Sequence, residues 1–590
     1  MGRRFTVLNL AAVAVGAVAG LAAVGLRYAI SWVQRVAFQG DAGAATPREE
    51  NTFVVSRWGW LVILVPALGG LAIAAIRRYW PAIRQHGVTE VMAAVQAKGG
   101  ILRARSSVGH ALLSAITVGT GGSTGREGPI GYIGATLGSS VARRLGLTPR
   151  DIKILLGCGF SAGIAASFNA PLGAVLMALE LIVPEFSTHA FIPLVGATVV
   201  GVTIGNMLLA GHATFAVPAF VFHSSWELIL YVVVGIVCGF AAVAFIRLIA
   251  WTYYAWAKSR MADFAKPVLG GLLVGILGFT MFWATSRSST MHDYHVFGTG
   301  YATMTNVLAT PADAYAPLLP ILAILVLAKP IATAITIGSG GAGGMFSVSL
   351  YQGALWGGLI GIAGHAIAPS IVVNPASYAL VGMGAFYAAS TRATLTAIVM
   401  ITELTRDYAI VAPLMLAAVT ADAVSVRLSK ETVYTLKLTQ TGVIYEHDRV
   451  QSPLDFLVVR DVMTKEVHGL PSDLSVGEAF NRMIDLGHTG YPVLGPDGKL
   501  KGVVTRRDLS KQLHAGKGAE SLGNVISGLT ITALAGETLY RARDRLHREG
   551  IGRLVVVDAV DRTQIVGILT RSDLLRAEAE RGVEHEDEWS

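Results

Sequence analysis

The stretch GTGGSTGREGPIGYIGATLG, residues 119–138, occurs a second time in altered form at residues 338–357, as GSGGAGGMFSVSLYQGALWG. The two copies are identical at 8 of 20 positions. A second block, CGFSAGIAASFNAPLGAVLMALEL (158–181), matches VGMGAFYAASTRATLTAIVMITEL (381–404) at 11 of 24 positions. The offsets of the two blocks, 219 and 223 residues, are nearly equal. Matched order over two blocks predicts two copies of one structural unit.

The composition predicts that both copies lie in a lipid bilayer. Of the 590 residues, 53% are hydrophobic and only 15% are charged. Charges become dense after about residue 437, so we expect a membrane domain over 1–436, with repeat halves at about 1–212 and 225–436. Five apolar runs approach or reach the roughly 20 residues that a helix needs to cross a membrane; they are residues 6–26, 58–76, 190–210, 227–246 and 317–337.

The net charge of +8 is explained by membrane topology rather than by nucleic-acid binding. The basic residues Arg3, Arg4, Arg77, Arg78 and Arg84 flank the first two spans. Because cytoplasmic flanks are enriched in Lys and Arg, we predict a multi-pass protein of the cell membrane with a cytoplasmic N-terminus.

The repeated glycine-rich turns predict an anion pathway. Duplicated membrane halves place the substrate site at their interface, where broken helices meet. The repeat superposes Glu127 on Phe346, so two helix N-termini face a common place. Helix N-termini carry partial positive charge and unpaired N–H donors, which favour an anion. The carboxylate of Glu127 would then take the place of such an anion.

Several motifs resemble the CLC family of chloride channels and chloride/proton exchangers. They are GREGP (125–129), the FNAPLGAVLMALE run (168–180), GMFSV (344–348) and Tyr434 in SKETVY. The resemblance implies the CLC fold, a multi-span α-helical membrane protein of two repeated halves with broken helices. It also implies chloride as the transported ligand and a homodimer in the lipid bilayer, with one pathway in each subunit.

The resemblance also implies roles for individual residues. Glu127 corresponds to the gating glutamate of the family. The turn at residues 85–89 corresponds to the family's first anion-binding motif, but has histidine in place of serine. The anion-binding residues implied are His86, Gly87, Arg126, Gly128, Met345, Phe346 and Tyr434.

Two carboxylates and one leucine bear on the mode of transport. Exchangers of the family commonly carry a glutamate pair after the FNAP helix, whereas this chain has Glu180 followed by Leu181. Because leucine carries no proton, Leu181 favours passive conduction, with a chloride/proton antiporter as the alternative. Glu180 and its repeat counterpart Glu403 are expected to bond to neighbouring backbone.

Other functions stay open at this point. The changed first motif leaves fluoride or nitrate as candidate anions. A divalent cation transporter regulated by the C-terminal region would need clustered carboxylates, and Glu127, Glu180 and Glu403 stand singly in the sequence. We predict no enzyme and no metal site, because His110 and Asp151 stand apart from any nucleophile–base arrangement.

The C-terminal region contains a second duplication. We expect a linker over 437–458, copies over 459–518 and 519–580, and an acidic tail over 581–590. GVVTRRD and GILTRSD close the two copies and resemble the ends of CBS domains, which pair as a cytoplasmic α/β Bateman module. The resemblance implies adenine nucleotide binding (ATP, ADP or AMP) through Thr505, Asp508, Thr570 and Asp573. The alternative is that these residues are ordinary helix N-caps in a module without a ligand.

Overall fold

The chain forms two compact units, one ending at residue 447 and the other beginning at residue 448. We call them the membrane unit and the C-terminal unit and describe each by itself. The computed structural model describes residues 2–41, 43, 58–80, 87–97, 99–183, 186–209, 226–285, 294–310, 316–440, 457–526, 531–558 and 561–577.

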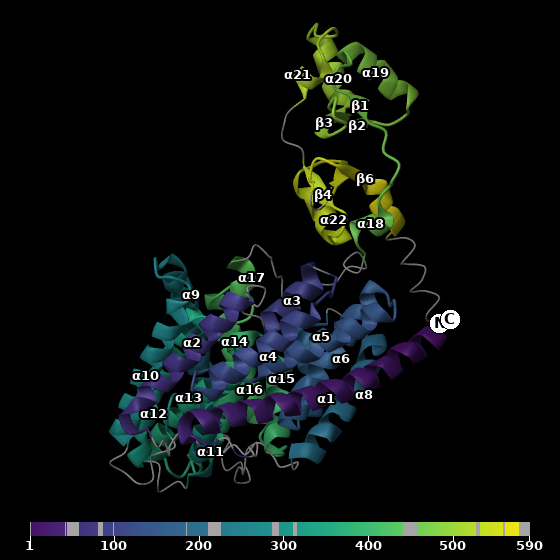
Figure 1. The fold of residues 1–590 in the computed structure, drawn as a ribbon. Helices are drawn as coiled ribbons and strands as arrows, with labels where there is room; N and C mark the ends of the chain where they lie inside the picture. Colours follow the sequence, from purple (N-terminus) through teal and green to yellow (C-terminus); the bar gives the residue numbers. More distant parts are fainter. Residues whose placement is uncertain are drawn as a thin grey trace. The chain divides into compact units, whose positions relative to one another are not determined.

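The named elements of the membrane unit are all helices (Figure 1). Within the described residues, nine helices are long and apolar enough to cross a bilayer, and each of the five predicted runs lies in one of them apart from one or two residues at an end of the run. The expected multi-span architecture is therefore confirmed. The elements are α1 (Gly2–Gln39), η1 (Gly59–Ile63), α2 (Leu64–Tyr79), α3 (Val88–Ala97), α4 (Ala104–Gly119), α5 (Glu127–Arg144), α6 (Pro149–Phe168), α7 (Pro171–Leu181), α8 (Thr188–Leu209), α9 (Glu227–Lys258), α10 (Ala265–Thr285), α11 (Tyr301–Ala309), η3 (Ala316–Leu318), α12 (Leu319–Ser339), α13 (Phe346–Ile367), α14 (Pro375–Thr391), α15 (Thr394–Thr405), α16 (Val411–Leu428) and α17 (Leu436–Gln440).

The sequence repeat appears as a repeat of helices. The series α4 to α8 has its counterpart in α12 to α16, and α5 packs on α6 as α13 packs on α14. Both α6 and α14 end in a left-handed residue, Asn169 with φ of 56° and Arg392 with φ of 60°. These residues are 223 positions apart, the offset of the second sequence block. Equivalent residues therefore terminate equivalent helices in the same way.

The two halves are joined by reciprocal hydrogen bonds between equivalent positions. Gly125 N–H donates to the carbonyl of Gly344 (2.8 Å), and Gly344 N–H donates to the carbonyl of Gly125 (2.7 Å). The two glycines are 219 residues apart, the offset of the first block. A mutual contact between identical positions is what a two-fold relation between the halves produces.

A second reciprocal pair lies in the same turns. The hydroxyl of Thr117 accepts from the N–H of Ala342, and the hydroxyl of Thr336 accepts from the N–H of Ser123, both at 3.1 Å. Each threonine ends a helix of one half and holds the glycine-rich turn of the other. These hydrogen bonds fix the two turns against each other, and each bond joins one copy to the other.

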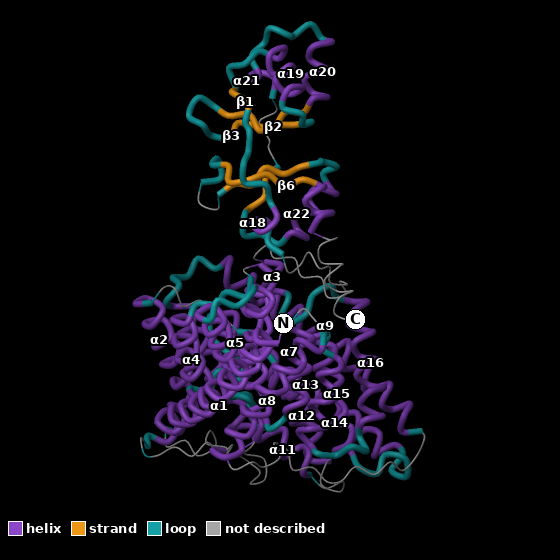
Figure 2. Tube along the Cα trace, turned by 90° about the vertical axis from the view of Figure 1, so that its right-hand side faces the viewer, coloured by secondary structure: helices purple, strands orange, loops and turns teal. Residues whose placement is uncertain are grey.

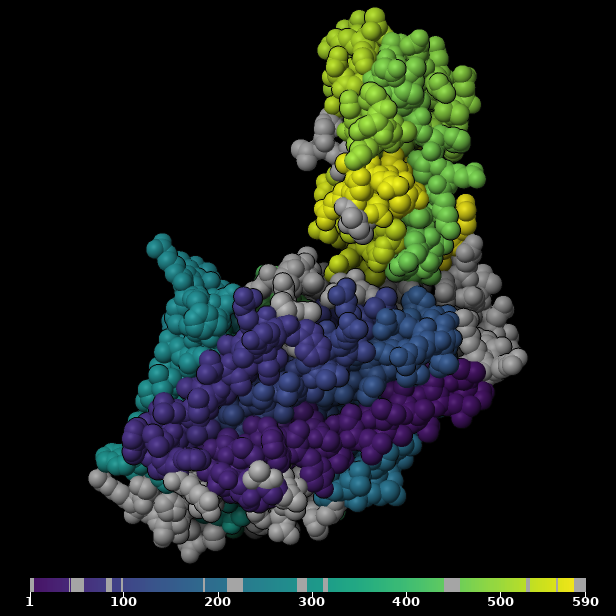
Figure 3. Space-filling view, in the orientation of Figure 1, coloured from purple at the N-terminus to yellow at the C-terminus, as the bar shows by residue number. Residues whose placement is uncertain are grey.

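Helix α1 shows how the unit meets lipid. In the view of Figure 3 it lies along the surface of the membrane unit, and it packs on α6 and α8. Ala12, Val15 and Ala19 are buried on its inner face, whereas Leu10 and Leu21 are 67% and 54% exposed. A helix that is apolar on both faces is typical of a protein surrounded by hydrocarbon.

The C-terminal unit consists of two similar halves, each with a three-stranded sheet and flanking helices (Figure 2). In each sheet the first strand pairs in parallel with the second, which pairs antiparallel with the third. The predicted α/β duplication is confirmed. The elements are α18 (Val459–Val462), β1 (Leu470–Pro471), α19 (Val476–Asp485), β2 (Gly490–Leu494), β3 (Leu500–Thr505), α20 (Arg506–His514), α21 (Leu522–Val525), β4 (Thr532–Leu534), α22 (Leu539–Arg548), β5 (Arg553–Val557), β6 (Ile565–Thr570) and a last helix over 571–577.

The halves of the C-terminal unit exchange short segments. Val459 of α18 is buried in the core built around β4 to β6, although it begins the first copy in sequence. Leu522 of α21 is buried in the core built around β1 to β3. Each core is therefore completed by a residue near the beginning of the other copy, which ties the two halves into one unit.

Candidate anion site

The helices that meet at the glycine-rich turns lack side-chain caps at their N-termini. No cap hydrogen bond comes from Arg126 before α5 or from Met345 before α13. The neighbouring repeat helices differ, because α6 is capped by Thr148 and α14 by Asn374. The first backbone N–H groups of a helix need partners from outside it. At α5 and α13 this position is therefore left without a capping side chain, in contrast to α6 and α14.

The two N-termini approach each other because the turns carry glycine. A Cβ atom at Gly344 would lie 2.6 Å from the backbone nitrogen of Gly128 and 3.2 Å from a carboxylate oxygen of Glu127. Any side chain at Gly344 would therefore push the two helix ends apart. The double hydrogen bond between Gly125 and Gly344 depends on this close approach.

The carboxylate of Glu127 lies at this junction and is held from the second half. Its Oε1 accepts a hydrogen bond from the hydroxyl of Tyr301 at 3.2 Å, and its Oε2 accepts one from the hydroxyl of Ser347 at 3.3 Å. The backbone N–H of Ser347, in the first turn of α13, also faces the carboxylate. Glu127 is 1% exposed, so its carboxyl group occupies a buried place lined by hydrogen-bond donors.

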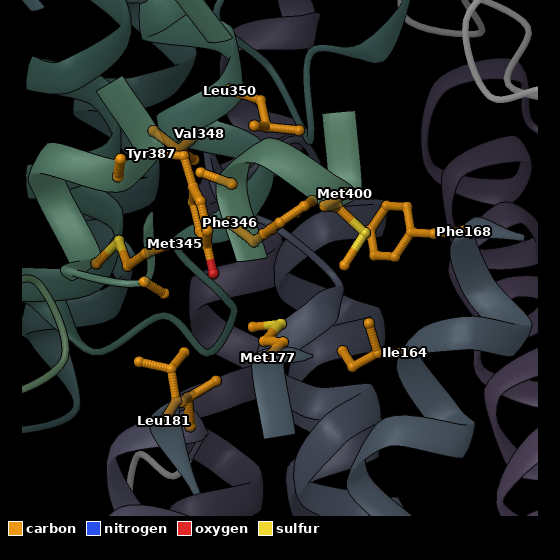
Figure 4. Close-up of a cluster of buried hydrophobic side chains, with 14 of the residues drawn as sticks. Ile164, Phe168, Met177, Leu181, Met345, Phe346, Val348, Leu350, Tyr387 and Met400 are labelled. Atoms are coloured by element: carbon orange, nitrogen blue, oxygen red, sulfur yellow. The ribbon is translucent and has the colours of Figure 1, made fainter. Parts of the chain in front are cut away.

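Aromatic rings surround the two helix starts. The guanidinium of Arg126 lies 5.0 Å from the centre of the Tyr301 ring and 5.9 Å from that of Phe168. Phe346 contacts the rings of Phe168 and Tyr387 at centroid distances of 5.1 and 4.9 Å. Figure 4 shows Phe346 among side chains from both halves. The predicted residues Arg126 and Phe346 thus lie at equivalent helix starts, against a shared apolar wall.

A cavity of about 100 Å³ lies beside the junction. Four of the predicted anion-binding residues line it: Gly87, Gly128, Met345 and Tyr434. Arg126 and Phe346 lie next to it at the helix starts, and His86 falls outside the described residues. The cavity therefore brings together backbone from the start of α3, from both glycine-rich turns and from the segment after α16.

Tyr434 offers a hydroxyl in this region. Its backbone is fixed to α3, because the hydroxyl of Thr89 donates to its carbonyl oxygen at 3.0 Å. The hydroxyls of Tyr434 and Tyr387 are close enough to interact electrostatically. Within the described residues neither is part of a hydrogen bond of ordinary geometry. Buried hydroxyl groups in proteins are normally hydrogen-bonded, so the hydroxyl of Tyr434, which lines the cavity, is suited to a ligand there.

Glu180 and Glu403 have a different and symmetrical role. Glu180 accepts from the N–H groups of Leu395 (3.0 Å) and Thr396 (2.8 Å) at the start of α15. Glu403 accepts from the N–H groups of Leu172 (3.0 Å) and Gly173 (2.7 Å) at the start of α7. Each glutamate caps the helix of the other half, so the expectation that they bond to backbone is confirmed.

Leu181 lies in the hydrophobic core. It is 3% exposed and belongs to the same buried cluster as Met177, Phe346 and Met400 (Figure 4). At the position where exchangers of the family commonly carry a proton-transferring glutamate, this chain therefore has a leucine that is buried among apolar side chains.

The C-terminal unit has a basic cleft of about 1,100 Å³ between its two halves. Arg506, Arg507 and Lys511 of α20 and Arg553 of β5 line it, and no carboxylate is found among its described lining residues. Burial lowers the pKa of Arg553, whose guanidinium donates to the carbonyl of Gly490 at 2.5 Å. A guanidinium stays charged despite such a shift, so the cleft is suited to an anion.

The four predicted nucleotide-binding residues lie in two equivalent places. Thr505 and Asp508 form a reciprocal capping pair at the start of α20, and Thr570 and Asp573 form the same pair at the start of the 571–577 helix. The helix-cap role expected as the alternative is therefore present in both copies. Of the four, only Thr505 lines the basic cleft.

Sequence reasoning missed three side chains of the membrane unit. Tyr301 and Ser347 hold the carboxylate of Glu127, and Lys329 lies fully buried in the middle of α12. Ser347 stood inside a quoted motif without an assigned role. A single lysine within a long apolar run is a recognisable signal, because charges inside membrane spans are costly and usually functional.

Comparisons with known proteins agree with this arrangement. The family model for the voltage gated chloride channel matches residues 68–426, and the CBS domain model matches 459–515 and 530–580. A ClcB-like protein of Ralstonia nicotianae is 33% identical over 388 residues, which cover 65% of this chain and 86% of that protein.

Two solved structures share the fold. A slow cyanobacterial Cl−/H+ antiporter aligns with a TM-score of 0.63 at 24% identity, over 74% of this chain and 97% of the other. A eukaryotic CLC transporter aligns with a TM-score of 0.61 at 19% identity, over 96% of this chain and 97% of the other. With a family match over more than half of its length, the chain belongs to the voltage-gated chloride channel (CLC) family and carries a pair of CBS domains.

Proposed function

We propose that the protein transports chloride through a pathway in the membrane unit and that Glu127 is its gate. The observation that carries the proposal is the position of the Glu127 carboxylate at the junction of two helix N-termini without capping side chains. While the carboxylate is ionised, it occupies the place of an anion and blocks it. Protonation, or an arriving chloride ion, displaces it and opens the pathway.

We propose passive conduction as the mode of transport. The burial of Leu181 among apolar side chains supports this mode, because no proton acceptor stands at that position. Glu180 does not replace it, since its carboxylate caps α15. The alternative is a chloride/proton antiporter whose proton route avoids Leu181.

The test is chloride efflux from liposomes that contain the purified protein and a pH-sensitive dye, under an outward chloride gradient. For passive conduction we expect chloride to leave without uphill proton movement, in the wild type and in Glu127→Gln alike. Uphill proton movement at a fixed ratio to chloride, abolished by Glu127→Gln, would instead establish an antiporter. Protein-free liposomes measure the leak, and fluoride or nitrate in place of chloride tests the preferred anion.

A divalent cation transporter has little support. The carboxylates of Glu180 and Glu403 cap helices, and Glu127 is held by hydroxyl groups. Among the described residues, no group of three or more His, Cys, Asp or Glu side chains is arranged to hold a metal ion. Chloride-independent cation flux in the same liposomes would favour this function.

The orientation and assembly belong to the same proposal. The basic flanks of the first two spans support a cytoplasmic N-terminus and a cytoplasmic C-terminal unit. Membership of the family supports a homodimer with one pathway in each subunit. Cysteine labelling from either side of intact cells tests the orientation, and mass photometry in detergent tests the dimer.

A second proposed function is regulation by an adenine nucleotide in the C-terminal unit. The basic cleft carries it, because four cationic side chains around about 1,100 Å³ suit a phosphate chain. We expect ATP to bind more tightly than AMP, and AMP more tightly than adenosine. Calorimetry on the full chain tests this order, and Arg507→Gln should weaken ATP far more than adenosine. Equal affinities for ATP and adenosine would exclude the phosphate-binding role.

A further inference from the structure

A lysine lies fully buried at the middle of a membrane-spanning helix. Lys329 is the central residue of α12 (Leu319–Ser339), and its side chain is 0% exposed. Its Nζ donates hydrogen bonds to two backbone carbonyls, those of Val296 (3.0 Å) and Gly298 (2.7 Å). It also lies 5.0 Å from the centre of the Tyr351 ring.

The carbonyls that Lys329 contacts belong to a buried, irregular segment. Residues 294–300 form neither helix nor strand, and nearly all of them are buried. Irregular backbone within a membrane protein needs partners for its polar groups. Lys329 serves two of the carbonyls, and the hydroxyl of Tyr351 donates to a third, that of His295, at 3.2 Å. The segment is thus held from α12 and α13.

The same segment leads directly to the gate. Phe297 packs against Gly121 of the first glycine-rich turn, and Gly298 N–H points to the carbonyl of Gly121 at 3.4 Å. Gly300 then adopts a left-handed φ of 82°, where a Cβ would lie 2.3 Å from the Tyr351 ring. The next residue is Tyr301, which starts α11 and donates to Glu127.

The first half of the membrane unit contains a related pair of side chains at the positions equivalent to Lys329 and Tyr351. The residue 219 positions before Lys329 is His110, which is also buried, and the counterpart of Tyr351 is Tyr132. Their rings lie 5.4 Å apart in an edge-to-face arrangement. A basic side chain on a tyrosine ring is therefore common to both halves, whereas the contact with the 294–300 segment belongs to Lys329.

From these contacts we infer that Lys329 is a positioning residue of the gate. Through its two bonds to the 294–300 segment it fixes Tyr301, whose hydroxyl holds the carboxylate of Glu127 in the blocking position. Lys329 touches neither the carboxylate nor an anion in this arrangement. Loss of its ammonium group frees the segment, so that Tyr301 holds Glu127 less often and the gate opens more readily. This inference rests on the proposed gating role of Glu127.

The direction of the effect follows from what Tyr301 stabilises. A hydroxyl donor favours the ionised carboxylate, so its loss makes protonation and displacement easier. The titratable and charged groups that face Glu127 are Arg126, Tyr301 and Tyr434. Those around Lys329 are Tyr351, Tyr294 and His295. The pH of half-maximal chloride flux should therefore move upward when Lys329 loses its charge.

The experiment is chloride efflux from liposomes as a function of pH, with single and paired substitutions. Lys329→Met removes the ammonium group and keeps the length of the chain, and Lys329→Arg keeps the donors. Tyr301→Phe removes only the hydroxyl that reaches Glu127. We expect Lys329→Met and Tyr301→Phe each to raise the flux at neutral pH and to shift the midpoint upward by about one unit, the tenfold change of one hydrogen bond to a charged group.

Pairs of substitutions separate positioning from general damage. If Lys329 acts through Tyr301, the double variant Lys329→Met/Tyr301→Phe should equal Tyr301→Phe alone. In the Glu127→Gln background, Lys329→Met should change the flux no further. With Glu127 present, Lys329→Arg should keep most of the wild-type pH profile. Equal changes with and without Glu127, or an unshifted midpoint in Lys329→Met, would overturn the inference.

A second variant serves if Lys329→Met does not fold. Tyr351→Phe leaves Lys329 in place and removes the hydroxyl that donates to the carbonyl of His295 and also interacts with Thr303 of α11. We expect a smaller upward shift of the midpoint, again absent in the Glu127→Gln background; no shift in a folded Tyr351→Phe protein would count against the inference. Failure of the proposed function is distinguishable, because Glu127→Gln alone would then leave the pH profile of the wild type unchanged.

Discussion

Glu127 and Phe346 begin equivalent helices in the two halves of the membrane unit, but one side chain is an acid and the other is an aromatic ring. The backbone around them is the same, with matched glycine turns, an uncapped helix start and a shared pair of hydrogen bonds. One half contributes a removable charge, and the other contributes a ring fixed between Phe168 and Tyr387. Duplication therefore produced two equivalent helix starts, and under the proposed function the divergence at this one position makes one of them a gate.

The largest expected effect on chloride flux comes from removing the charge of Glu127. Glu127→Gln keeps the shape of the side chain but has no charge to compete with chloride. We expect chloride flux at neutral pH to rise about tenfold or more, because the blocking carboxylate is worth several hydrogen bonds to a charged group. The pH dependence should disappear below pH 7, as measured by chloride efflux between pH 4 and 7.

The counterpart variant is the control. Phe346→Leu changes the same position of the other half, where no charge is present, and should alter the flux while keeping its pH dependence. A Glu127→Gln protein that still closes as the pH rises from 4 to 7 would show that the asymmetry between the halves is not the origin of gating.

The next effect concerns Tyr434, which follows the last helix of the second half. Its hydroxyl makes no hydrogen bond of ordinary geometry within the described residues and lies beside the cavity. We expect Tyr434→Ala and Tyr434→Phe both to weaken chloride binding, the latter by about tenfold, the value of one hydrogen bond to a charged partner. Calorimetric titration with chloride measures it, and unchanged affinity in both variants would remove Tyr434 from the anion site.

A third experiment uses the positions at which the halves agree. Glu180→Gln and Glu403→Gln each weaken a charged cap on a helix of the other half. We expect each to lower the free energy of unfolding by about 1–2 kcal/mol, the usual contribution of such a bond. The melting temperature in detergent is the measurement, and chloride flux should stay within twofold of wild type. A large change in proton coupling for Glu180→Gln alone would reveal a functional difference within this symmetrical pair.

A smaller effect on chloride flux is expected at Lys437, which lines the cavity. Lys437 lies in α17, after the last spanning helix, and lines the cavity with Tyr434. Burial lowers the pKa of Lys437 to about 8, so its positive charge is present at neutral pH and is lost as the pH rises through 8. Since a cation attracts anions, the loss of this charge beside the cavity should reduce chloride flux by about threefold.

The background of this experiment matters, because Glu127 also responds to pH. In Glu127→Gln, flux should decline as the pH rises from 7 to 9, and Lys437→Met should be low at every pH. Lys437→Arg, whose charge persists, should show no decline. A decline that survives in Lys437→Arg would assign it to another group.

The sequence predicted the fold through its repeats and predicted the site through its motifs. The double turn at 119–138 and 338–357 identified the two helix ends, and the GREGP motif identified Glu127. Contacts between segments that lie far apart in the sequence could not be predicted from repeats and motifs. Tyr301 reaches Glu127 only because the left-handed Gly300 turns α11 toward it, and no local pattern states where that helix points.

The C-terminal unit illustrates the same limit. Thr505 and Asp508 carry a pattern that serves equally for a nucleotide and for a helix cap, and the structure uses it as a cap in both copies. The four cations of the cleft come from α20 and β5, which are about 40 residues apart. Their meeting depends on the packing of two domains, whereas each domain alone could be recognised from its closing motif.

The smallest expected effect compares the two copies of the C-terminal unit. Asp561 and Asp497 occupy equivalent turns, but only Asp561 accepts from both the N–H and the hydroxyl of Thr563 and pairs with Lys499 of the other copy. The Thr563 hydroxyl and N–H, followed by Lys499, lower the pKa of Asp561 to about 2. A lowered pKa means that the ionised group stabilises the fold above about pH 4 and that this contribution is lost as the pH falls toward 2.

Asp561→Asn should therefore speed hydrogen exchange in β6 by about twofold at pH 7, as expected for an exposed charge pair, and by progressively less below pH 4. Asp497→Asn should have a smaller effect at pH 7, because its side chain accepts from the N–H of Lys499 alone in the equivalent place. Equal changes in both variants would mean that the link to Lys499 adds nothing to the contact between the copies.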